Sequence, residues 1–261
     1  MKKLAISAIK SIASVTFWIV VWLLISLFVN DSLLLPSPIS VFKVLLGLVQ
    51  TLDFWKAVLK SLLNVASGVV ISFMIGGILA YLMSASKIMN SLFSPLLSVI
   101  KATPVASFIV IAFLWFSISA LPSFIATLIV IPIVTSNIMQ GINAVKPELK
   151  DVAKIYQFSP VKKLLKLYVP SVLPYFLAAC KSSLGMAWKA CIAAEMIVFA
   201  SGSIGEKLHN SKTYFEFDDA FAWTLVTVIL SVCLEKLIIF VLDRLGRRLK
   251  AVSRGDDHAQ A

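Results

Sequence analysis

Five side chains recur at helical spacing inside the apolar run at residues 172–199: Lys181, Gly185, Trp188, Lys189 and Glu195. Together with Ile192, four of them follow alternating spacings of four and three residues along one stripe of a helix, and Lys189 lies at the edge of this stripe. A charged side chain at the centre of a bilayer costs about 2.5 to 3.5 kcal/mol, so such groups normally face protein or water. Two lysines beside water would bind an anion, which makes the stripe a candidate translocation path. In the alternative interpretation, Lys189 and Glu195 pair with other helices and Lys181 reaches the membrane surface.

Side chains for enzymatic chemistry are scarce. His209 and His258 are the only histidines, and the sequence contains no H-E-x-x-H, G-x-S-x-G or G-x-x-x-x-G-K-[ST] motif. Cys180, Cys191 and Cys233 lie in apolar runs, which favours small buried hydrophobic side chains over a disulfide framework or a metal site. We therefore expect no catalytic residues, no metal and no nucleotide-binding loop in this chain.

The composition indicates a membrane protein. Charged residues make up 14% of the 261 residues, against about 25% in ordinary soluble domains, and the mean hydropathy is +0.95. The apolar runs are continuous rather than alternating, which favours helices over a β-barrel. We expect an all-α, polytopic fold in which residues 1–261 form a single transmembrane domain. The net charge of +11 reflects membrane topology rather than nucleic-acid binding.

Six transmembrane helices are predicted, at residues 11–29, 61–84, 94–117, 121–142, 172–199 and 219–241. Lys and Arg concentrate before the first span, in the loop 143–171 and after residue 241, while few lie on the opposite side. Cytoplasmic loops carry such an excess, so both termini and the loop 143–171 are expected in the cytoplasm.

Small residues form a ridge along the second span, at Gly68, Ser72, Gly76 and Ala80. Residues four apart share one helix face, and small side chains let another helix come close in lipid. The ridge predicts that this span is packed inside a helical bundle.

The loop 143–171 predicts two short helices outside the membrane. Pro147 suits the first position of one helix, and Ser159 with Pro160 suits the start of another. Apolar side chains on these helices form a knob ringed by lysines, whereas a plain membrane-surface element is the alternative. Pro170 and Pro174 are expected to break the chain where the loop meets the fifth span.

The loop resembles the EAA motif of permease subunits of bacterial ABC importers, in which Glu-Ala-Ala is followed by Gly and then by Ile-x-Leu-Pro. The matching positions are Asp151, Val152, Ala153, Gln157, Leu167, Val169 and Pro170. Gln157 departs from the motif glycine, which would permit a positive φ. We expect Gln157 to adopt another turn geometry or to lengthen the first helix.

The flanking sequence resembles one branch of that family, the permeases for nitrate, sulfonates, taurine and related compounds. The likeness covers a core at residues 60–245 and is carried by KPELKDVA, by PVASFIVIAFLWFSIS and by SVLPYFLAACKSSLGMAWKACIAAEMIV. Ser117 and Ser119 stand where glycines are expected, which is a second departure.

The resemblance implies a permease in a bacterial inner membrane, in which the cytoplasmic loop docks on an ABC ATPase dimer that binds ATP and Mg. Asp151, Val152, Ile155 and Tyr156 would form the docking contact. A second permease subunit, expected as a homodimer, and an extracytoplasmic substrate-binding protein would complete the importer. The substrate would be a small anionic or heterocyclic solute.

Two other functions compete with this one. An ion-driven secondary transporter would carry out uptake alone and would favour inverted repeats or broken helices. A membrane-embedded enzyme would need a catalytic cluster, and none is apparent.

Overall fold

The computed structural model describes residues 2–31 and 33–258, with side chains for residues 13–31, 33–242 and 244. Helices form nearly all of the described chain. They are α1 (Lys2–Val29), α2 (Pro38–Val49), α3 (Leu52–Ala85), α4 (Lys87–Ala102), α5 (Val105–Ala112), α6 (Leu121–Asn143), α7 (Pro147–Ile155), α8 (Pro160–Lys163), the π-helix η1 (Leu164–Tyr168), α9 (Val169–Val198), α10 (Ile204–Thr213) and α11 (Phe217–His258). The predicted all-α fold is confirmed.

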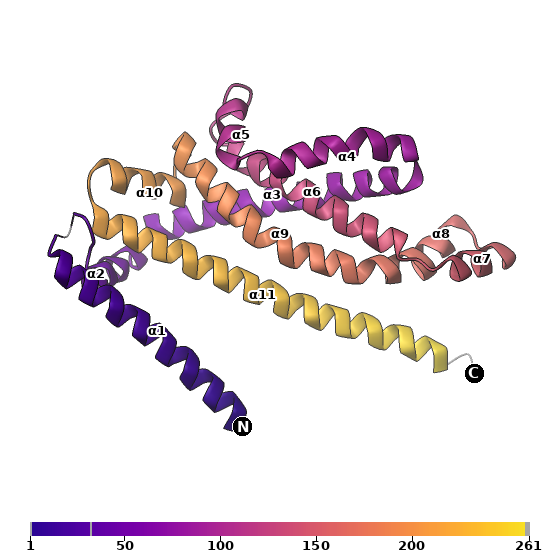
Figure 1. Cartoon of the computed structure of the whole chain (residues 1–261), viewed down its shortest axis with the longest axis horizontal. Helices are drawn as coiled ribbons and strands as arrows, with labels where there is room; N and C mark the ends of the chain where they lie inside the picture. The colour runs from indigo at the N-terminus through magenta and orange to yellow at the C-terminus, as the bar shows by residue number, and fades with distance from the viewer. Residues whose placement is uncertain (1, 32, 259–261) are drawn as a thin grey trace.

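The centre of the bundle is made by α3, α6 and α9, with α11 alongside α9 (Figure 1). Its main core contains buried side chains from all four helices, including Val65, Val130, Trp188 and Trp223. The predicted ridge on α3 lies at this core: Gly68, Ser72, Gly76 and Ala80 are all buried. A Cβ on Gly68 would lie 2.7 Å from Ala126 Cβ on α6, so a larger side chain would force the two helices apart.

Four helical stretches are long and apolar enough to cross a membrane: Leu52–Ala85, Leu121–Asn143, Pro160–Val198 and Phe217–Leu242. The bent pair α4 and α5 would make a fifth. In α1 the stretch Ala13–Val29 is apolar but shorter. The structure therefore supports a multi-pass helical protein. Judged by length and composition, the described helices provide four or five membrane spans, fewer than the six predicted.

The predicted third span at 94–117 is wrong as a continuous helix. The chain bends by 104° between α4 and α5. Thr103 is extended there, with ψ of 133°, because the ring of Pro104 disfavours helical geometry in the preceding residue. Pro104 also lacks an N–H to continue the hydrogen-bond ladder, so α5 leaves in a new direction.

The first helix is attached to the bundle by its C-terminal part. Trp22 Nε1 donates a hydrogen bond to the Pro36 carbonyl at 3.1 Å, and its ring stacks on Phe221 of α11. Toward its N-terminus α1 diverges from the other helices (Figure 1). Apolar side chains of α1 that precede Trp22, such as Phe17 and Trp18, are exposed.

Candidate functional site

The loop between α6 and α9 contains the predicted pair of short helices. Pro147 stands in the first turn of α7, where its missing N–H removes no helical bond. Ser159 caps α8 by accepting a hydrogen bond from the Lys162 N–H at 3.3 Å. Both helix starts follow from the local sequence.

Gln157 adopts the conformation that a glycine would provide, with φ of 47°. The Phe158 N–H donates to the Ala153 carbonyl at 2.9 Å, and the Gln157 N–H donates to the Lys154 carbonyl at 3.1 Å. These two bonds are the Schellman arrangement, which ends a helix with one left-handed residue. The expectation of a different turn or a longer helix is therefore wrong, because the two hydrogen bonds hold glutamine in the glycine geometry.

The loop has a buried side and an exposed apolar side. Ala153 is buried with Val145 and Leu167, and Phe158 and Tyr168 pack around them. This small cluster fixes α7 against the start of the following long helix.

The exposed side of α7 holds the residues expected to contact an ATPase. Ile155 and Tyr156 are 76% and 73% exposed, and Val152 is also exposed. Asp151 lies beside them, exposed as well. Large apolar side chains displayed in this way on a polar loop are typical of a protein-binding surface.

The chain does not break at Pro170 and Pro174, which corrects the sequence-based expectation. Residues 160–198 run as one helical stretch through η1 into α9. The Val169 N–H bonds to the Leu164 carbonyl, five residues back, which widens the helix just before Pro170. A π-turn provides a different hydrogen-bond register at the point where Pro170 has no N–H to donate. The loop is thus continuous with α9.

The Glu195 side chain is fully buried and accepts hydrogen bonds from two other helices, α3 and α10. Its Oε2 accepts from Ser61 Oγ of α3 at 2.6 Å and from the Gly205 N–H of α10 at 3.2 Å. Its Oε1 accepts from Asn64 Nδ2 at 2.8 Å. Ser61 Oγ in turn accepts from the Ile204 N–H at 3.0 Å. The carboxylate sits at the N-terminus of α10, where the helix dipole favours negative charge.

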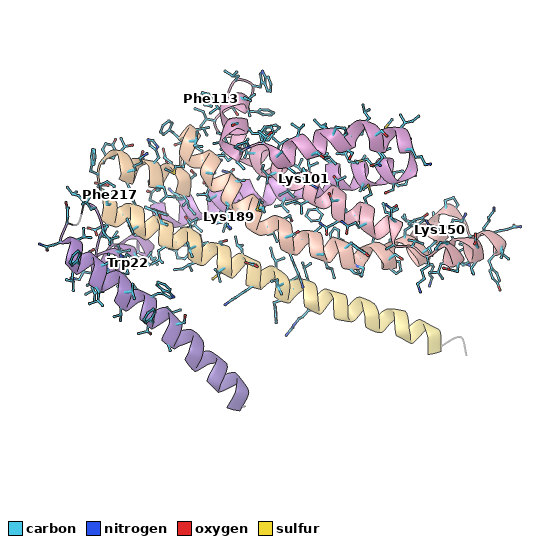
Figure 2. The ribbon with its side chains drawn as sticks, viewed as in Figure 1. Trp22, Lys101, Phe113, Lys150, Lys189 and Phe217 are labelled. Carbon is cyan, nitrogen blue, oxygen red and sulfur yellow. The ribbon has the colours of Figure 1, made fainter. Side chains whose placement is uncertain are left out.

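The predicted stripe on α9 is divided between two surfaces. Trp188 is buried, and its Nε1 donates to the Thr227 carbonyl of α11 at 3.1 Å. Lys189 is exposed, near the middle of the bundle (Figure 2). Lys181 and Gly185 are half-buried. Trp188 and Glu195 therefore lie on the face of α9 that packs inside the bundle, whereas Lys189 lies on a face that is exposed.

Sequence reasoning missed the partners of Glu195. Ser61 and Gly205 were not singled out, although a Cβ on Gly205 would lie 2.3 Å from Glu195 Cβ. Polar Ser61 and Asn64, three residues apart in an apolar helix, are the signal that could have pointed to a buried acceptor. Among the residues that the structure describes, no three His, Cys, Asp or Glu side chains gather as a metal site.

Comparison with known proteins decides the family. Residues 68–251 match the family described as the binding-protein-dependent transport system inner membrane component. The chain belongs to this family of ABC transporter permeases.

Relatives and a solved structure agree with the assignment. The permease is 27% identical over 210 residues to a probable ABC transporter permease protein of Haemophilus influenzae, covering 80% of this chain and 84% of the relative. It is 29% identical over 206 residues to the nitrate import permease protein NrtB of Synechococcus elongatus, covering 76% and 70%. A crystal structure of an amino acid ABC transporter with histidines superposes with a TM-score of 0.61 at 18% identity, covering 74% of this chain and 94% of the other, and so shares the fold.

Membership explains the absence of enzymatic motifs from the sequence. The permease is a multi-pass transport subunit of an ABC importer, not an enzyme.

Proposed function

We propose that this permease forms, with a second copy of itself, the membrane path of an ATP-driven importer for a small anionic or heterocyclic solute. A cytoplasmic ABC ATPase dimer would hold ATP and Mg, and an external binding protein would deliver the solute. The termini and the α7–α8 loop face the cytoplasm in this arrangement, in line with the distribution of Lys and Arg.

One observation carries the proposal: the exposed apolar face of α7 is joined to a transmembrane helix by buried packing and by a continuous helical chain. The buried Ala153 and Leu167 tie α7 to η1, and η1 continues into α9 without a break. A partner that binds Val152, Ile155 and Tyr156 and then moves would therefore move α9 with it. An exposed loop joined flexibly to the bundle would transmit no such motion.

The polar residues of α9 take different parts in this proposal. Lys181 and Lys189 line the path and attract an anion, with Gly185 leaving open space beside them, since no atom lies within 4 Å of its added Cβ. Trp188 and Glu195 fix α9 against α11, α3 and α10. The relative that transports nitrate, a small anion, supports an anionic solute.

Co-purification with the native ATPase tests the coupling. We expect the tagged wild-type permease to recover an ATPase from its native membrane in mild detergent and Ile155→Asp to lose it, because a charge on the apolar face opposes docking. Lys150→Ala on the same helix is the matched control and should retain the ATPase (Figure 2). Recovery of the wild type alone in several gentle detergents would favour the ion-driven transporter instead.

A further inference from the structure

A candidate binding site separate from the α7–α8 loop lies near the α10 end of the bundle. A cavity of about 620 Å³ opens between three segments: α3, the connection from α5 to α6, and the turn from α9 to α10. Its lining includes Lys60, Phe113, Phe116, Ser117, Phe199 and Ser201. Phe113 lies at the end of α5, at the edge of the bundle (Figure 2). The cavity volume suits a small organic molecule.

Of the described residues that line this cavity, Lys60 alone is charged. It is half-buried, and in the part of the chain that the structure describes it makes no ion pair. The neighbouring Ser61 binds Glu195, but that carboxylate is fully buried and is held by neutral donors on α3 and α10. A positive charge at a half-buried residue that makes no such ion pair attracts an anion to the cavity.

The rings of Phe113, Phe116 and Phe199 form the apolar part of the cavity. Two of these rings also pack against aromatic rings of other residues. Phe116 stacks on Phe124 with ring centroids 4.0 Å apart, and Phe199 meets His209 edge-to-face at 3.9 Å. Phe113 and Phe199 remain 49% and 52% exposed. The fixed rings present apolar surface to a ligand without having to be ordered by it.

Phe199 lines the cavity from a left-handed helix end. Phe199 ends α9 with φ of 55°, and the following Ala200 N–H bonds to the Glu195 carbonyl at 3.0 Å. Glycine fits such a helix end without steric strain, whereas phenylalanine does not. Phenylalanine carries this strain at a helix end where its side chain lines the cavity.

We propose that this cavity binds an aromatic monoanion, such as an aryl sulfonate or aryl carboxylate. The anionic group would pair with Lys60 Nζ and accept hydrogen bonds from Ser117 and Ser201, while the ring packs among Phe113, Phe116 and Phe199. An inorganic anion would use the charge but leave the three apolar rings without a partner. The site therefore selects for an apolar body attached to the anion. As a first binding site for imported solute, it rests on the proposed function.

Calorimetric titration of the purified full-length permease, without any ATPase, tests the site directly. Benzenesulfonate and benzoate are the probes, and nitrate and benzylamine are the comparison ligands. We expect both aromatic anions to bind one per chain. Nitrate should fail to compete because it lacks the ring, and benzylamine because it carries the wrong charge.

Three variants separate the cavity from general effects on folding. Lys60→Met keeps the length of the side chain but removes its charge, and should weaken benzenesulfonate binding about tenfold. Phe199→Gly removes a ring while relieving the positive φ, and should weaken it about fivefold. Phe215→Gly relieves a φ of 61° at the end of α10, outside the cavity lining, and should bind as the wild type does.

The proposal is overturned if the wild type binds neither aromatic anion, if nitrate competes equally, or if both cavity variants bind like the wild type. Because the titration needs no ATPase, its failure with normal ATPase recovery rejects this site alone. Binding by a permease that recovers no ATPase would support the site and reject the coupling.

Discussion

The Glu195 carboxylate accepts a hydrogen bond from Ser61 Oγ at 2.6 Å, across 134 positions of the chain. The same oxygen accepts from the Gly205 N–H at the start of α10. One side chain thereby holds three helices together inside the bundle, where both Glu195 and Ser61 are fully buried.

Glu195→Ala should lower the free energy of unfolding by about 2 to 4 kcal/mol. The change leaves the Asn64 amide and the Gly205 N–H buried without an acceptor, and each such donor costs about 1 to 3 kcal/mol. Thermal unfolding of the purified permease in detergent measures the effect. Glu216→Ala, an exposed acid after α10, is the control and should change little. A Glu195→Ala protein as stable as the wild type would mean that the carboxylate does not hold these helices together.

Gly68→Ala should destabilise the protein by about 1 to 3 kcal/mol, because the added Cβ would lie 2.7 Å from both Ala126 Cβ and the Ser123 carbonyl oxygen. Gly47→Ala on α2 is the matched control, since no atom lies within 4 Å of its added Cβ and alanine favours a helix. The unfolding temperature of each variant is measured and compared with that of the wild type. An equal effect at both positions would contradict the close packing of α3 on α6.

Gln157→Gly should stabilise the loop by about 1 kcal/mol, because glycine adopts the observed φ of 47° without a clash between Cβ and the backbone. The rate of proteolysis within α7 and α8 reports on this stability and should fall. Gln50→Gly at the end of α2 is the control, as Gln50 has an ordinary φ of −80° and its replacement by glycine brings no such relief. Faster cleavage of Gln157→Gly would indicate that the glutamine side chain itself supports the turn.

Asp151→Lys should reduce transport several-fold without loss of membrane insertion, since it reverses a charge on the exposed docking side while leaving the buried Ala153 cluster intact. Uptake in cells and the amount of permease in the membrane are measured together. Lys150→Ala serves as the control on the same helix. Undiminished uptake with normal recovery of the ATPase would count against the proposed docking face.

Interactions between residues close together in the sequence determined the helix starts of the α7–α8 loop, and the sequence alone also indicated the packing face of α3 and the membrane class. Proline at the first turn of α7 and the Ser159–Pro160 pair at α8 set helix starts through interactions only a few residues apart. The small residues of α3 and the polytopic class are likewise readable in the sequence, because helical spacing and mean hydropathy are local quantities.

Only the tertiary structure decided the partners of Glu195 and the path of the chain at its prolines. The partners of Glu195 come from α3 and α10, and its spacing along α9 cannot distinguish a buried hydrogen-bond acceptor from a residue lining a path. Pro104 and Pro170 are both prolines in apolar helical runs, yet the chain bends by 104° at the first and continues through a π-turn at the second. A missing N–H permits either outcome, and the packing of neighbouring helices determines which one has the lower free energy.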